Sequence, residues 1–220
     1  MKMEVNVFDR TETNDTLISG SVYNLVIGLT LVWGFAINWL MVENIPVESI
    51  SSINPILFFI GYFASCFLGI YLFSKSESPV VSFIGYNFVV VPFGLIINLV
   101  VSQYNPDIVL EAIRVTGMVT FVMMLLGSMY PAFFKKISGG LTVALLCVIV
   151  VELIEIFIFN THHGILDWIV AVIFCGYIGY DWARANAIPK TYDNAIDSAA
   201  ALYMDIINLF LRILRILGRK

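Results

Sequence analysis

Residues 16–42 read TLISGSVYNLVIGLTLVWGFAINWLMV and contain no charged side chain. As a helix, a run of this length crosses the ~30 Å hydrocarbon core of a bilayer. The run is too long for the core of a signal peptide, and no small-residue cleavage site follows it. We therefore expect an anchored membrane helix rather than a leader that is removed.

The rest of the chain repeats this pattern. Uncharged runs cover 49–74, 78–106 and 115–134, prolines lie in the connections, and three later apolar segments are interrupted by acids. Residues 1–16 are polar and predict a short cytosolic tail. Residues 17–220 predict one all-α integral membrane domain, a bundle of seven transmembrane helices. The predicted spans are about 17–41, 53–73, 81–102, 109–130, 141–159, 166–184 and 196–217.

The composition agrees with a membrane protein. Of 220 residues, 60% are hydrophobic and 13% are charged, whereas soluble domains are nearer half apolar and a quarter charged. A soluble chain this short exposes too much of its surface to hide so many apolar side chains. The net charge of −4 is small, and the charges are spread out with no basic patch, so we expect no nucleic-acid partner. Cys66, Cys147 and Cys175 lie in apolar runs without metal-ligand spacing, so we expect neither disulfides nor a cofactor.

Lysine and arginine in the short loops predict the orientation. A cytosolic N-terminus puts Lys2, Arg10, Lys75, Lys135, Lys136, Arg184 and Lys190 inside, and leaves the outer loops near 43–52, 103–108 and 160–165 without either residue. We expect an integral protein of the cell membrane, inner or plasma, with its N-terminus in the cytosol. The C-terminus is the exception, because it carries Arg212, Arg215, Arg219 and Lys220. Either the last helix crosses against the rule or it is re-entrant, and the sequence leaves both open.

An ionisable residue inside a membrane span marks a functional site by default, and Asp181 and Asp205 are the sharpest cases in the last two predicted spans. Asp181 is about one turn from the cytosolic end of its helix, and Asp205 is about nine residues into the next one. Antiparallel helices joined by a short loop would bring both carboxylates to a similar depth. Two carboxylates that close would share a proton, which suits a pH sensor, a proton relay or a transient divalent-cation site. For Asp181, a structural pair with Arg184 is the alternative.

The last predicted helix has one polar face along its whole length. Asn194, Asp197, Ser198, Ala201, Asp205, Asn208, Arg212, Arg215 and Arg219 recur at spacings of three and four. A span exposed to lipid would not tolerate this face, so we expect the helix to be central in the bundle. An amphipathic helix on the membrane surface, with Asp205 in solvent, is the alternative.

The segment 177–218 resembles the last two helices of the transmembrane Bax inhibitor motif family, in a bacterial-type member. The matching features are Tyr180-Asp181 late in the sixth helix, a short polar loop, and then ALYMDIINLF at 201–210. The spacing of 24 residues between the aspartates is similar to the family's di-aspartyl spacing. The layout of seven spans agrees over essentially the whole chain.

This resemblance implies a leak for cations, chiefly Ca²⁺, that is gated by protonation. In the family, a central seventh helix is surrounded by six others, and its aspartate pairs with that of the sixth near the cytosolic mouth. Asp181 and Asp205 would then be the pH-sensing gate, with Lys75, Arg184 and Asn208 as candidate partners. A cluster of arginines usually follows the second helix of bacterial relatives, whereas here only Lys75 could replace it.

A second group of charges lies toward the outer side. Glu152 and Glu155 are three residues apart on the fifth predicted helix, and Arg114 is one turn into the fourth. These charges predict either a buried ion pair between the two helices or, with Glu111 and Asp167, an acidic vestibule that collects cations.

Other functions fit less well. Intramembrane aspartyl proteases carry Gly-x-Gly-Asp and Pro-Ala-Leu motifs, and neither occurs here, so we expect no enzyme. A regulatory partner of a membrane protease or of another membrane protein is the stronger rival, because almost no mass lies outside the bilayer. A proton-coupled secondary transporter is the third hypothesis, although no inverted repeat is evident.

Overall fold

A computed structural model describes residues 16–155, 158 and 164–219, most of which are helical and none of which forms a strand. Most of the predicted tail (1–15) and of the last predicted outer loop (159–163) lies outside the described residues. The helices are α1 (Gly20–Asn44), α2 (Val47–Ser51), α3 (Pro55–Lys75), α4 (Pro79–Val101), α5 (Pro106–Met129), α6 (Pro131–Ile154), α7 (Gly164–Ala187) and α8 (Tyr192–Gly218).

Six of these helices are long and apolar enough to cross a membrane: α1, α3, α4, α5, α6 and α7. The prediction of an all-helical membrane protein is therefore confirmed. The last predicted span corresponds to α8, which carries three acids, Asp205 among them, and two arginines. It is not among the six. That α8 is the seventh span, and that it is central, remain predictions.

Prolines set where four of the long helices begin. Each of α3, α4, α5 and α6 has proline at its first position, where the missing N–H is not needed by the helix. Pro131 explains why α6 begins ten residues before the predicted span 141–159. The helix starts one residue after Tyr130, and it includes Lys135 and Lys136, which had been expected in a loop.

Helix α8 is continuous over 27 residues. It has no break at which the chain could turn back, so the structure does not show the re-entrant alternative. Asp205 is only 7% exposed, which also disagrees with a surface helix that keeps this carboxylate in solvent.

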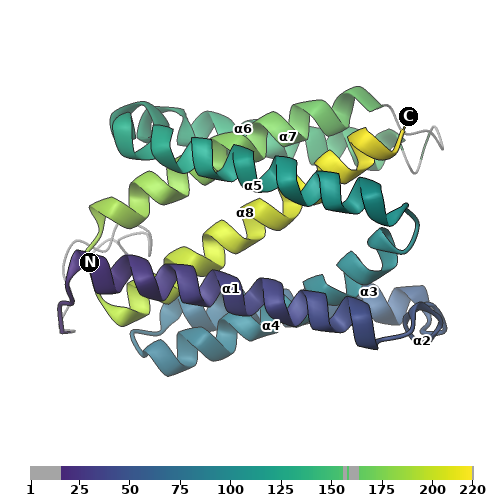
Figure 1. The fold of residues 1–220 in the computed structure, drawn as a ribbon, viewed down its shortest axis with the longest axis horizontal. Coiled ribbons are helices and arrows are strands. Elements are labelled where there is room, and N and C mark those ends of the chain that lie inside the picture. The colour runs from purple at the N-terminus through teal and green to yellow at the C-terminus, as the bar shows by residue number, and fades with distance from the viewer. Residues whose placement is uncertain (1–15, 156–157, 159–163, 220) are drawn as a thin grey trace. The chain divides into compact units, whose positions relative to one another are not determined.

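The chain divides into two compact units, one containing residues 1–103 and 187–203 and the other containing 104–186 and 204–220. In the first unit, α4 contacts both α1 and α3 (Figure 1). The α3–α4 contact is close at Gly69 and Gly85, because a Cβ built on Gly69 would lie 2.5 Å from the Gly85 carbonyl oxygen. One turn before Gly69, the Ser65 hydroxyl donates to the Phe88 carbonyl at 2.8 Å. Small residues thus allow the two backbones to approach, as in many membrane helix pairs.

Buried hydrogen bonds connect α1, α4 and α8 within the same unit. The Tyr203 hydroxyl donates to Asn38 Oδ1, and Asn38 Nδ2 donates to the Val90 carbonyl at 3.0 Å. The Tyr86 hydroxyl donates to the Thr30 carbonyl at 3.0 Å. Buried polar groups in folded proteins are almost always hydrogen-bonded, so each of these groups depends on its partner.

Replacing Asn38 should therefore destabilise the first unit. Asn38→Leu leaves the buried Tyr203 hydroxyl without its acceptor, which costs about 1–3 kcal/mol. The matched control is Asn44→Leu, since Asn44 is exposed near the end of the same helix and donates only to the Leu40 carbonyl. Thermal unfolding in detergent should show a lower midpoint for Asn38→Leu than for Asn44→Leu. Equal midpoints would contradict a stabilising role for Asn38.

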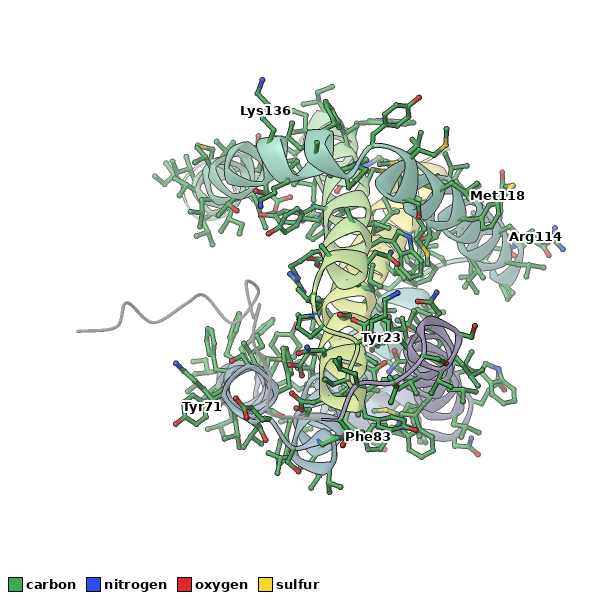
Figure 2. The ribbon with its side chains drawn as sticks, turned by 90° about the vertical axis from the view of Figure 1, so that its left-hand side faces the viewer. Tyr23, Tyr71, Phe83, Arg114, Met118 and Lys136 are labelled. Atoms are coloured by element: carbon green, nitrogen blue, oxygen red, sulfur yellow. The ribbon has the colours of Figure 1, made fainter. Side chains whose placement is uncertain are left out.

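The second unit contains α5, α6, α7 and α8 from Met204 onward. A Cβ built on Gly127 of α5 would lie 2.5 Å from the Gly179 carbonyl oxygen of α7, and Phe134 of α6 lies against the same Gly179. Arg114 and Met118 of α5 and Lys136 of α6 point away from the unit (Figure 2). The buried charged side chains of this unit lie along α7 and α8.

Candidate functional site

The first cluster of buried charges begins on α7. Asp181 and Arg184 are one turn apart near the end of this helix, and Arg184 Nη1 lies 2.7 Å from Asp181 Oδ1. Both side chains are 9% exposed. The helix ends at Ala187, two residues before Pro189, because a residue that precedes proline disfavours the helical conformation. The predicted pairing of Asp181 with Arg184 is thus present in the structure.

Asp205 of α8 completes this cluster. Its carboxyl group lies within hydrogen-bonding range of the Asp181 carboxyl and within electrostatic range of Arg184. Tyr177 of α7 is close enough to interact with both aspartates. Asp205 Oδ2 is buried and has no hydrogen-bond partner among the described residues. We call Asp181, Arg184 and Asp205 the aspartate site.

This arrangement can take up and release a proton. A hydrogen bond between two carboxyl groups requires that one of them is protonated, and two ionised carboxylates at this separation repel each other. Arg184 balances one negative charge, so the aspartate site is neutral when it holds one shared proton. Loss of that proton leaves a net charge of −1 in a buried place, which is costly.

Asn208 and Lys75 are the other two candidate partners. Asn208, one turn after Asp205, donates from Nδ2 to the Met204 carbonyl of its own helix at 2.8 Å. Lys75 is the exposed last residue of α3 and belongs to the other unit. Among the described residues, no group of three or more histidine, cysteine, aspartate or glutamate side chains could hold a metal ion.

A second buried cluster lies where α6, α7 and the end of α8 meet. Arg212 forms a two-pronged contact with Glu152, in which Nη2 lies 3.0 Å from Oε2 and Nη1 pairs with Oε1. Arg212 Nη1 also lies 3.0 Å from Asp167 Oδ1. Asp167 is fully buried and contacts two further guanidinium groups, Arg215 at 3.6 Å and Arg219 at 2.7 Å. We call these five residues the Arg212 cluster.

The Arg212 cluster corrects the predicted ion pair between α5 and α6. Glu152 pairs with Arg212 of α8 rather than with Arg114, which is exposed and points away from the unit (Figure 2). Glu111 is exposed as well, and Glu155 is half-buried, so the structure does not gather them with Asp167 into an acidic vestibule. Asp167 instead neutralises the basic end of α8. Sequence reasoning missed Arg212, although the signal was present in its place on the polar face of α8 that also carries Asp205.

A comparison with known protein families tests the resemblance that the last two helices suggest. A family model described as inhibitor of apoptosis-promoting Bax1 matches residues 16–220. The chain belongs to this Bax inhibitor-1 family. The predicted resemblance is therefore confirmed, and the match covers every described helix.

Relatives of this Bax inhibitor-1 family chain occur in bacteria and in eukaryotes. An uncharacterised protein of Helicobacter pylori is 28% identical over 166 residues, 74% of this chain and 70% of the relative. A Vibrio cholerae membrane protein is 31% identical over 57% of this chain and 56% of its own length. Bax inhibitor 1 of Schizosaccharomyces pombe is 32% identical over 57% of this chain and 47% of its own length. Together with the six apolar helices, these matches identify an integral membrane protein.

Proposed function

We propose that this protein is a pH-sensitive leak for cations, chiefly Ca²⁺, in which the shared proton of Asp181 and Asp205 controls closure. The observation that carries the proposal is the direct contact of two buried carboxyl groups from different helices, with a single arginine beside them. Buried ionisable side chains in membrane proteins mark ion or proton pathways by default. The proposal involves no enzymatic step and no resident cofactor.

The shared proton supplies a mechanism for the gate. While the aspartate site holds one proton, the carboxyl groups attract each other and α7 stays in contact with α8. When that proton leaves, two carboxylates face one guanidinium, and their repulsion favours separation of the helices. Separated carboxylates are oxygen ligands of the kind that Ca²⁺ prefers. Repulsion thus opens the path and exposes a transient cation contact in it.

Charge distribution supports an orientation for this leak. We propose a cell-membrane protein with a cytosolic N-terminus, because every lysine and arginine before α8 except Arg114 then lies inside. Asp181 and Arg184 lie in the last two turns of α7, so the aspartate site would face the cytosolic end of that helix. The Arg212 cluster, at the first turn of α7, would face the opposite end.

Flux of Ca²⁺ into proteoliposomes tests the proposal. For the purified protein we expect a flux that changes severalfold between about pH 6 and pH 8, within the limit of about tenfold per pH unit that one linked proton allows. Asp205→Asn and Asp181→Asn remove one member of the shared-proton pair, so their flux should become nearly independent of pH. Asp107→Asn is the control, because Asp107 is an exposed acid at the start of α5.

Each other outcome points to a different function. Flux no greater than in empty liposomes at every pH would exclude a leak and favour a regulatory partner of a membrane protease or another membrane protein. Proton uptake in a fixed ratio to a second solute would favour a proton-coupled transporter. If both asparagine variants keep the full pH dependence of the wild type, the aspartate site does not control the gate.

A further inference from the structure

The Arg212 cluster and the aspartate site differ in how completely their polar atoms are paired. Both carboxylate oxygens of Asp167 contact guanidinium groups, and both Nη atoms of Arg212 contact carboxylates. In the aspartate site, the buried Asp205 Oδ2 has no hydrogen-bond partner among the described residues. Incompletely paired buried groups occur where a protein changes state, whereas fully paired networks are rigid. The Arg212 cluster is therefore the fixed contact of the two.

Helix geometry links the two clusters. Arg212 and Asp205 are seven residues apart on α8, which separates them by about 10 Å along the axis but only about 20° around it. On α7, Asp167 and Asp181 are fourteen residues apart, about 21 Å along the axis and about 40° around it. Both acids of α7 thus point toward the same face of α8, at two different levels. Leu209, which is 1% exposed, lies between the two levels on α8.

We propose that Arg212 is a positioning residue for the gate. Its contacts with Glu152 of α6 and Asp167 of α7 fix the rotation and depth of the second half of α8, and thereby hold Asp205 against Asp181. A rotation of α8 by one residue would turn Asp205 by about 100° away from α7. This inference rests on the proposed function, and it assigns to Arg212 the control of the pH at which the gate responds.

The chemistry of arginine suits this role. The planar guanidinium of Arg212 donates two parallel hydrogen bonds to the Glu152 carboxylate, which fix the relative orientation of the two groups as well as their separation. A lysine ammonium keeps the charge but can rotate about a single contact. The described groups that face Asp205 are Asp181, Arg184 and Tyr177, all from α7. Since Arg212 is not among them, its effect on Asp205 must pass through the position of α8.

The pH profile of Ca²⁺ flux tests this role, with Arg212→Gln, Arg212→Lys and a matched control. The control is Arg114→Gln, because Arg114 is exposed, points away from the unit (Figure 2) and belongs to neither cluster. We expect Arg212→Gln to change the flux at the closed pH by about fivefold or more, the lower end of typical coupling between sites. Arg212→Lys should shift the profile less and remain folded, and Arg114→Gln should match the wild type.

The outcomes separate this inference from the proposed function. A wild-type protein without flux overturns both. A wild-type protein with pH-dependent flux, beside a folded Arg212→Gln variant whose profile is unchanged, overturns only the inference. If Arg212→Gln does not fold, Arg212→Lys decides, and a wild-type profile in that variant overturns the inference. An equal shift in Arg114→Gln also overturns it, because a general loss of positive charge would then explain the change.

Discussion

Asp167→Asn is expected to give a protein that unfolds at a much lower temperature than the wild type. Asp167 is 0% exposed and contacts three arginines. Removing its charge leaves these guanidinium groups, one of them largely buried, without their common partner. Removing one partner of a buried ion pair lowers the free energy of unfolding by about 3–5 kcal/mol. The loss should appear as a lower midpoint of thermal unfolding in detergent and as a lower yield of folded protein.

A matched control separates the effect of losing a buried charge from the effect of losing an acid at the start of a helix. Asp107 and Asp167 both lie in the first turn of a long helix, α5 and α7 respectively. An acid at that position stabilises any helix by about 0.3–1 kcal/mol through the helix dipole. Because Asp107 is exposed, Asp107→Asn measures this smaller effect alone. Asp167→Glu keeps the charge and should lie between the wild type and Asp167→Asn.

Equal unfolding midpoints for Asp107→Asn and Asp167→Asn would contradict the importance of the Arg212 cluster. Such a result would mean that water reaches the arginines easily enough to replace Asp167. The positioning role of Arg212 would then also lose its physical basis, because a hydrated cluster cannot fix the rotation of α8.

The hydrophobic runs predicted most of the fold because membrane helices satisfy their backbone hydrogen bonds within one segment. Uncharged segments therefore had to be helical, whatever their neighbours. Helix ends were harder to place. The charges of Lys135 and Lys136 suggested a loop, yet long basic side chains near a helix end can extend toward the interface while the backbone stays helical. Pro131, which begins α6, was the stronger signal.

The aspartate site was accessible to sequence reasoning because its members lie on adjacent helices joined by a short loop. That topology makes helices antiparallel neighbours, so depth along each helix predicts contact. Asp181 and Asp205 needed no further information, and the structure brings them together.

The Arg212 cluster was not predicted because its members come from three helices. Glu152 is 60 residues from Arg212 along the chain, and hydropathy does not report which face of α6 meets α8. A nearer cation, Arg114, seemed a sufficient partner for Glu152. Pairing between distant helices is decided by the packing of small residues such as Gly127 and Gly179, which bring α5 and α7 together. A single sequence does not reveal which of its glycines do this.

Gly85→Leu is expected to disrupt the first unit more than any other single change among its glycines on α3 and α4. A Cβ at Gly85 would lie 2.7 Å from the Gly69 carbonyl oxygen and 2.9 Å from the Phe73 backbone nitrogen. Backbone atoms cannot move aside as a flexible side chain does, so the helices must separate. Adding atoms to a packed core costs about 1–3 kcal/mol when side chains can adjust. A leucine side chain at position 85 would meet backbone atoms, so we expect its cost to exceed that range.

Gly61→Leu is the matched control, since both glycines are in the interior of long helices but a Cβ on Gly61 would meet nothing within 4 Å. Leucine favours a helix by nearly 1 kcal/mol over glycine, so Gly61→Leu should unfold at the wild-type temperature or slightly above it. Gly85→Leu should yield little folded protein, and Gly85→Ala an intermediate amount. If Gly85→Leu and Gly61→Leu unfold alike, α3 and α4 do not meet at Gly69 and Gly85. Their contact would then depend on Ser65 and the apolar side chains, which a larger residue can push apart without unfolding the unit.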